Sequence, residues 1–140
     1  MSQANVDTLL GGYEWFRVTG RFPAHLATPD FVWDMSHFDG WPEQQVYEGV
    51  EGADDFFAEW VSAWDDWEVE IEALHDVGDK VLVITKQRGI SKLSGIPAEM
   101  QMAMLWTFRD GKEARMDMYS DPSEALDVVG LEGQRCRRTP

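Results

Sequence analysis

The chain has 140 residues, 44% of them hydrophobic and 12% aromatic, with a formal net charge of −14 at pH 7. This length suits a single domain with its own core, and no apolar run approaches the roughly 20 residues that span a bilayer. Between Asp30 and Asp79 there are sixteen Asp or Glu and no Lys or Arg, which argues against partners such as nucleic acid and anionic membranes.

The N-terminal part predicts two helices. Apolar residues at helical spacing predict an amphipathic helix over residues 4–19, with Tyr13 on its apolar stripe. Gly11 and Gly12 weaken the interior of this helix. The segment RFPAHLA that follows is typical of one or two helical turns, because a proline stands near its start and another blocks its continuation.

The segment DFVWDMSHFDGW begins with a predicted strand, residues 30–36, which has a carboxylate in its middle. Alternation puts Asp34 on the same face as Val32 and Ser36, opposite Trp33. A carboxylate on a core strand is costly unless it is paired or unless its altered protonation serves chemistry. Both explanations of Asp34 are open at this point.

A loop with a short edge strand around Val46 comes next, followed by a helix. Asp54 and Asp55 suit the first turn of that helix, and Trp60 and Trp64 belong to its buried stripe. At residue 67 the hydrophobic period changes to two, which predicts a half-buried strand.

Three further strands are predicted in the segments KVLVITKQRG, AEMQMAMLWTF and EARMDMYS. Turns at Gly-Asp, Gly-x-Pro and Asp-Gly separate them, and Asp110-Gly111 is a strong signal for a tight hairpin. Asp121 then caps a last short helix that ends at Gly130.

The predicted fold class is α+β, with helices covering one face of a curved mixed or antiparallel sheet. A long and strongly twisted sheet of this kind curls into a cone around a cavity. We expect one domain over residues 1–131 and a flexible tail over residues 132–140.

This order of elements, with YEGVEGADDFFAEW before the long helix and LWTFRDGKEARMDMYSD across the last hairpin, resembles a known family. It is similar to the SnoaL-like branch of the nuclear transport factor 2-like superfamily over residues 5–131. The resemblance implies a cone-shaped α+β barrel with a deep apolar pocket, and often a homodimer formed through the sheet. The fold hosts polyketide cyclases, ketosteroid isomerases, epoxide hydrolases, dehydratases and non-catalytic subunits, so it does not decide the function.

The resemblance also suggests catalytic residues. Beside ketosteroid isomerase, Tyr13 falls where that family keeps an oxyanion-stabilising tyrosine, Asp34 where it keeps the general base, and Met104 where it keeps a protonated aspartate. Beside limonene-type epoxide hydrolases, Arg88 falls on the catalytic arginine, but Ile90 and Met118 replace the catalytic aspartates. We therefore expect Asp34 to face the cavity as a base with a raised pKa, and Tyr13 or Arg88 to steady developing negative charge.

Structural alternatives exist for each of these three side chains. In these alternatives Asp34 is a carboxylate hydrogen-bonded for structural reasons, Tyr13 is an ordinary core tyrosine, and Arg88 is an exposed arginine at a strand end. Methionines that share strand faces, with tryptophans of the long helix, indicate a soft pocket lining for a flat apolar ligand. The expected substrate-binding residues are Val32, Trp60, Trp64, Met102, Met104, Trp106, Met116 and Met118.

No metal site and no cofactor are expected. The segment DMSHFD contains Asp34, His37 and Asp39, but its spacing matches no strong metal motif. Cys136 has no second cysteine to pair with, and the segment MSQANVDTLL lacks the features of a secretion signal, so we expect a cytoplasmic location.

The sequence therefore predicts a small cytoplasmic pocket protein. We expect cofactor-free acid–base chemistry, of an isomerase, cyclase or hydrolase type, on a small hydrophobic molecule with a carbonyl or similar group. The alternative is a non-catalytic module that binds a small molecule or assembles as a dimer.

Overall fold

The computed structural model describes residues 2–38 and 46–130. The predicted tail and the loop around Asp39 lie outside these residues. The elements are, in chain order, α1 (Ser2–Thr19), a 3-10 helix (Ala24–Leu26), β1 (Ala27–His37), β2 (Val46–Glu48), α2 (Gly49–Ser62), β3 (Trp64–Val77), β4 (Lys80–Ser91), β5 (Pro97–Arg109), β6 (Lys112–Tyr119) and α3 (Pro122–Val128).

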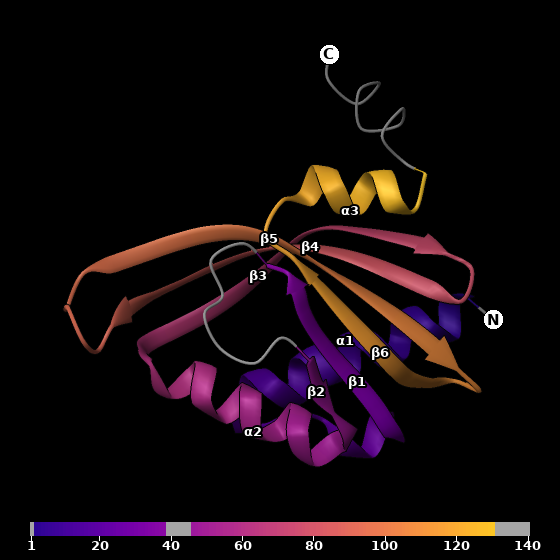
Figure 1. Cartoon of the computed structure of the whole chain (residues 1–140), viewed down its shortest axis with the longest axis horizontal. Helices are drawn as coiled ribbons and strands as arrows, with labels where there is room; N and C mark the ends of the chain where they lie inside the picture. The colour runs from indigo at the N-terminus through magenta and orange to yellow at the C-terminus, as the bar shows by residue number, and fades with distance from the viewer. Residues whose placement is uncertain (1, 39–45, 131–140) are drawn as a thin grey trace.

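The strands form one six-stranded mixed sheet in the order β2-β1-β6-β5-β4-β3. Strand β1 runs parallel to β6, and the other neighbours are antiparallel. Figure 1 shows the long strands β3, β4 and β5 arching over α1 and α2. The expected α+β architecture with a curved sheet is confirmed.

The two faces of the sheet are covered by different helices. Helices α1 and α2 lie against the inner face, and α3 lies on the opposite, outer face (Figure 1). Leu126 of α3 packs in a second buried cluster with Leu82 and Leu105, which are side chains of the outer face. The N-terminal helices thus cover one face of the sheet, as expected, and α3 adds a cover over an apolar patch of the outer face.

Helix α2 begins at Gly49, five residues before the predicted first turn. Asp54 therefore does not stand at the helix start. Its carboxylate instead accepts hydrogen bonds from Nε of Arg21 at 3.2 Å and from the backbone N–H of Phe22 at 3.3 Å. This contact ties the segment after α1 to α2 and helps to fix α1 under the sheet.

The hairpin between β5 and β6 contains the tight turn that the sequence predicts. Asp110 and Gly111 both have positive φ, 54° and 79°, as a two-residue hairpin turn of this type requires. Two residues later the pairing becomes irregular: Phe108 pairs with Glu113, whereas Thr107 pairs with Arg115. Ala114 is the extra residue of a β-bulge, which turns Glu113 onto the same face as Phe108.

No helix within residues 2–38 and 46–130 has the length and hydropathy needed to cross a membrane.

Candidate functional site

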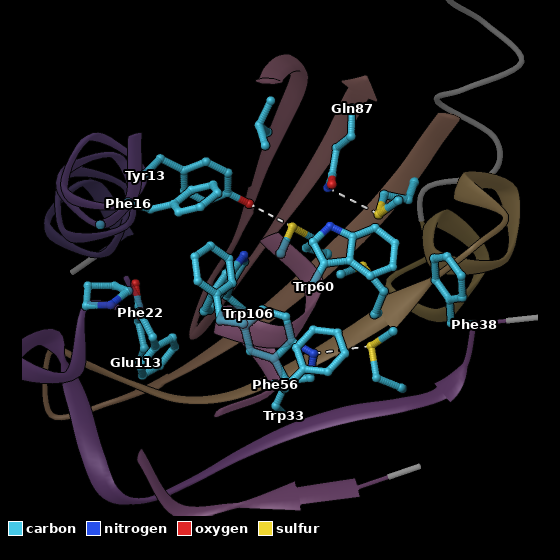
Figure 2. A pocket seen from close by; sticks show the side chains of 18 of the residues that line it. Tyr13, Phe16, Phe22, Trp33, Phe38, Phe56, Trp60, Gln87, Trp106 and Glu113 are labelled. Atoms are coloured by element: carbon cyan, nitrogen blue, oxygen red, sulfur yellow. Dashed lines mark hydrogen bonds between the residues drawn. The ribbon is translucent and has the colours of Figure 1, made fainter. Parts of the chain in front are cut away.

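A pocket lies between the inner face of the sheet and helices α1 and α2. Aromatic rings dominate its lining, among them those of Trp33, Phe56, Trp60 and Trp106 (Figure 2). The space between its lining atoms amounts to about 620 Å³ including the open mouth, and about 50 Å³ of this admits the centre of a water molecule. The pocket is thus narrow and apolar, and its polar side chains are few.

Glu113 is the most unusual of these polar side chains. It is 1% exposed, and neither carboxyl oxygen has a hydrogen-bond partner among the residues that the structure describes. Burial raises the pKa of the Glu113 carboxyl well above its usual value of 4.5. Since an ionised carboxylate without a partner is very costly in an apolar site, Glu113 is favoured in its neutral, protonated form.

Helix α1 forms the wall beside Glu113. Gly12 packs so close that a Cβ atom at its position would stand 3.3 Å from Oε2 of Glu113 and 3.3 Å from Cγ of Pro23. Gly12 is unfavourable in the interior of a helix, but a residue without a side chain leaves room here for the carboxyl of Glu113.

Tyr13 also lines the pocket, one residue further along α1. Its hydroxyl donates a hydrogen bond to Sδ of Met104 at 2.9 Å, and its ring meets that of Trp106 edge-on at 6.2 Å. Burial raises the pKa of Tyr13 well above its usual value of 10.0. The phenol therefore keeps its proton. It donates this proton in a hydrogen bond to a thioether sulfur, which is a weak acceptor.

Gln87 of β4 is the third polar group of the lining. Its Nε2 donates to Oγ1 of Thr85 at 3.3 Å and to Sδ of Met102 at 3.2 Å. Its Oε1 is buried and has no partner within the described part of the chain. The residues that line the pocket thus carry a carboxyl, a phenol, an amide and the buried, unpartnered indole N–H of Trp106, and most of the other described lining is apolar.

Asp34 does not face this pocket, so the orientation expected for it is wrong. Its neighbours Trp33 and Met35 line the pocket, which puts Asp34 on the outer face of the sheet. There its Oδ2 accepts a hydrogen bond from Nη2 of Arg115 at 2.6 Å, and its Oδ1 accepts one from the backbone N–H of Ser36 at 2.8 Å.

These contacts show that Asp34 is a paired carboxylate, which is one of the two explanations left open by the sequence. Burial acts to raise the pKa of Asp34, but the hydrogen bonds from Ser36 and the charge of Arg115 outweigh it, and the pKa lies below the usual 3.8. Arg115 also holds the carboxylate of Asp117 at 3.0 Å. Asp34 is therefore a paired, ionised side chain of the outer face, which is the opposite of the expected base in an apolar cavity.

Arg88 is likewise directed away from the pocket. Its side chain, 42% exposed, forms ion pairs with Glu68 at 3.0 Å, Glu70 at 3.3 Å and Glu99 at 3.2 Å on the neighbouring strands. Alternation explains this position, since the adjacent residue Gln87 is the one that turns inward. The expectation that Arg88 steadies charge in the cavity is corrected accordingly.

Eight residues were expected to line the pocket. The structure brings five of the eight residues to the pocket surface, namely Trp60, Met102, Met104, Trp106 and Met118. Val32 shares the outer face with Asp34, Trp64 packs against Gly89 at the start of β3, and Met116 is fully buried in the core. These three are not lining residues.

The structure adds Glu113 and Gln87, which the sequence did not single out. Gln87 could have been found from alternation, because it shares a face with the buried Val83 and Thr85. Glu113 could not have been found in this way. Alternation counted back from Met116 and Met118 places it on the outer face of the sheet unless the bulge is known.

Within the described residues no group of three or more His, Cys, Asp or Glu is arranged to hold a metal ion.

The comparison with protein families matches residues 21–116, more than two thirds of the chain, to the model of the SnoaL-like domain. The search of curated proteins found no match.

Several solved structures are similar to the chain. TerC, co-crystallised with polyporic acid, has a TM-score of 0.70 and 22% identity over 90% of this chain and 98% of its own. A protein from Jannaschia sp. CCS1, described as a SnoaL-like polyketide cyclase, has a TM-score of 0.72 and 22% identity over 91% and 92%. An NTF2-like protein from Burkholderia pseudomallei K96243 has a TM-score of 0.71 and 16% identity over 91% and 98%. At these identities the likeness concerns the fold.

Proposed function

The chain belongs to the SnoaL-like family, and from this premise we propose that it catalyses proton transfer on a small hydrophobic carbonyl compound, with Glu113 as the catalytic residue. The observation that carries the proposal is a carboxyl buried to 1% exposure whose two oxygens are both without a hydrogen-bond partner in the described structure. Such a group is costly to stability, and perturbed carboxyls in clefts are concentrated at functional sites.

A neutral carboxyl can act with both of its oxygens. One oxygen gives its proton to the carbonyl oxygen of the ligand, while the other takes a proton from the adjacent carbon. The carbonyl compound becomes its enol, and Glu113 is protonated both before and after the step. No external base and no change of oxidation state are required.

Tyr13 supplies a second donor for the same oxygen. Its hydroxyl is held by the sulfur of Met104, so a ligand oxygen that enters the pocket offers a stronger acceptor at little cost. A donor aimed at developing negative charge in a water-poor site is worth more than the same donor in water.

The lining also limits the kind of ligand. Among residues 2–38 and 46–130, no Lys or Arg lines the pocket, and the acidic chain adds a negative potential around it. Carboxylate and phosphate ligands would therefore be unpaired and repelled. Flat, uncharged ring systems suit the aromatic walls and the thioethers of Met102 and Met118.

The test follows deuterium uptake from heavy water next to the carbonyl group of a panel of enolisable ring ketones such as 2-tetralone. The Glu113→Gln variant keeps the shape of the side chain but cannot relay a proton, so exchange should fall at least about 100-fold. Glu51→Gln, at an exposed position in the first turn of α2, is the matched control and should exchange like the wild type. Equal exchange by wild type and Glu113→Gln on every ketone that exchanges would refute the role of Glu113.

A non-catalytic binding module is the second candidate, because a narrow apolar pocket with few polar groups can bind a small molecule whether or not a proton is then transferred. It predicts that ring ketones bind to the wild type without any deuterium uptake.

The homodimer is a separate proposal that the resemblance suggests. Light scattering after size exclusion measures the molar mass, and a value near twice 16.0 kDa would support a dimer.

A further inference from the structure

Gln87 carries an acceptor that the protein itself leaves unused. Its carbonyl oxygen Oε1 is buried without a partner in the described structure, and the whole residue is 3% exposed. A buried acceptor without a donor is rare in folded proteins and costly to maintain. It therefore points to a partner that comes with the ligand.

The orientation of the amide is fixed by its neighbours. The hydroxyl of Thr85 lies 3.4 Å from the backbone carbonyl of Met102 and donates its single proton there, so towards Gln87 it acts as an acceptor. The sulfur of Met102 is also an acceptor. Both therefore require N–H groups, and Nε2 of Gln87 supplies its two protons to them. The free oxygen is left on the pocket side.

Gln87 and Glu113 enter the pocket from opposite sides (Figure 2). The pairing along β5 agrees, because Gln87 stands opposite Met100, whereas Glu113 stands opposite Phe108 at the other end of that strand. Between them lie mainly apolar groups, including Met104 and the ring of Trp106, whose indole N–H is buried without a partner in the described structure. A ligand that reaches both polar groups is elongated and carries one polar atom near each end.

We propose that Gln87 is a specificity-determining residue that selects ligands with a hydroxyl or N–H donor, remote from the atom that meets Glu113. With the proposed function, on which this inference rests for the use of the pocket, the substrate class becomes a flat, uncharged ring compound with a carbonyl at one end and a donor at the other. A hydroxylated polycyclic ketone has this pattern.

Three naphthalenes that differ in one substituent at the same position test the acceptor: 2-naphthol, which has a donor, 2-methylnaphthalene, which has the same shape but no polar atom, and the slightly longer 2-methoxynaphthalene, which has only an acceptor. Dissociation constants come from amide-detected NMR titrations of the full chain, and the side-chain amide signals of Gln87 show where each probe binds. We expect 2-naphthol to bind about tenfold more tightly than the other two and to shift those signals. Equal affinities, or a preference for 2-methoxynaphthalene, would overturn the inference.

Variants assign the preference to one atom. Gln87→Met keeps the length of the side chain and removes the acceptor, so the tenfold preference should disappear. Gln101→Met, on the exposed outer face of β5, is the matched control and should retain it. Persistence of the preference in Gln87→Met would contradict the inference, and if that variant fails to fold, the wild-type series with the Gln87 signals decides the question.

The outcomes separate this inference from the proposed function. Glu113→Gln should lose deuterium exchange and keep the preference for 2-naphthol, whereas Gln87→Met should lose the preference. If the wild type prefers 2-naphthol but catalyses no deuterium exchange in any ketone, the role of Gln87 in specificity stands and the catalytic role of Glu113 is excluded.

Discussion

Two adjacent glycines of α1 allow the packing of Glu113 to be measured. In Gly11→Ala the new Cβ meets no atom within 4 Å, so the variant gains the helix propensity of alanine, about 1 kcal/mol. In Gly12→Ala the same gain is offset, because the Cβ would stand 3.3 Å from the Glu113 carboxyl and from the ring of Pro23. Overpacking of a tight site costs about 1–3 kcal/mol. We therefore expect Gly12→Ala to be about 1–3 kcal/mol less stable than Gly11→Ala.

The assay is urea unfolding followed by tryptophan fluorescence, with both variants and the wild type compared at one pH. Repeating Gly12→Ala in a Glu113→Ala background should reduce the penalty, because only the contacts with Pro23 and Leu26 then remain. An equal gain in stability for the two glycine variants would refute the packing of α1 against Glu113.

Three further predictions concern stability. The pKa of Glu113 is higher in the folded state than in the unfolded state, so the folded state binds an extra proton as the pH rises above about 4.5. The free energy of unfolding of the wild type should therefore fall from about pH 4.5 upward. Urea unfolding of Glu113→Gln across the same pH range should not show this fall. Asp34→Asn should lower the free energy of unfolding by roughly 1–3 kcal/mol at neutral pH and leave 2-naphthol binding unchanged, and weakened binding would return Asp34 to the site. Arg88→Gln should cost less than about 1 kcal/mol in thermal unfolding, because its ion pairs are exposed; a larger loss would contradict that assignment.

Much of the fold could be predicted from the sequence, because periodicity and turn chemistry are local. The change of period at residue 67 and the turn at Asp110-Gly111 led to the correct hairpins. The start of α2 was misplaced since acidic residues at Asp54 and Asp55 suit a first turn, yet Asp54 serves a contact with Arg21 that is distant in sequence.

The site was harder to predict, because it depends on which face of each strand is turned inward. Alternation separated Asp34 from Trp33 correctly, but the resemblance assigned the inner face to Asp34, although the aromatic and thioether side chains of the other face had more to gain from burial. Glu113 depends on a single bulge at Ala114, which changes the face of one residue and leaves no trace in a hydrophobic pattern.

The central claim is that a proton-bearing carboxyl stands inside the apolar pocket. Carbon-detected NMR of the glutamate side-chain carboxyls across a pH titration, with Glu113 assigned by its absence in Glu113→Gln, tests this directly. The expected result is a Glu113 signal whose titration midpoint lies well above 4.5, the usual pKa of a glutamate side chain. A Glu113 signal with a midpoint at or below 4.5 would show an ionised, solvated side chain and would contradict the proposed chemistry.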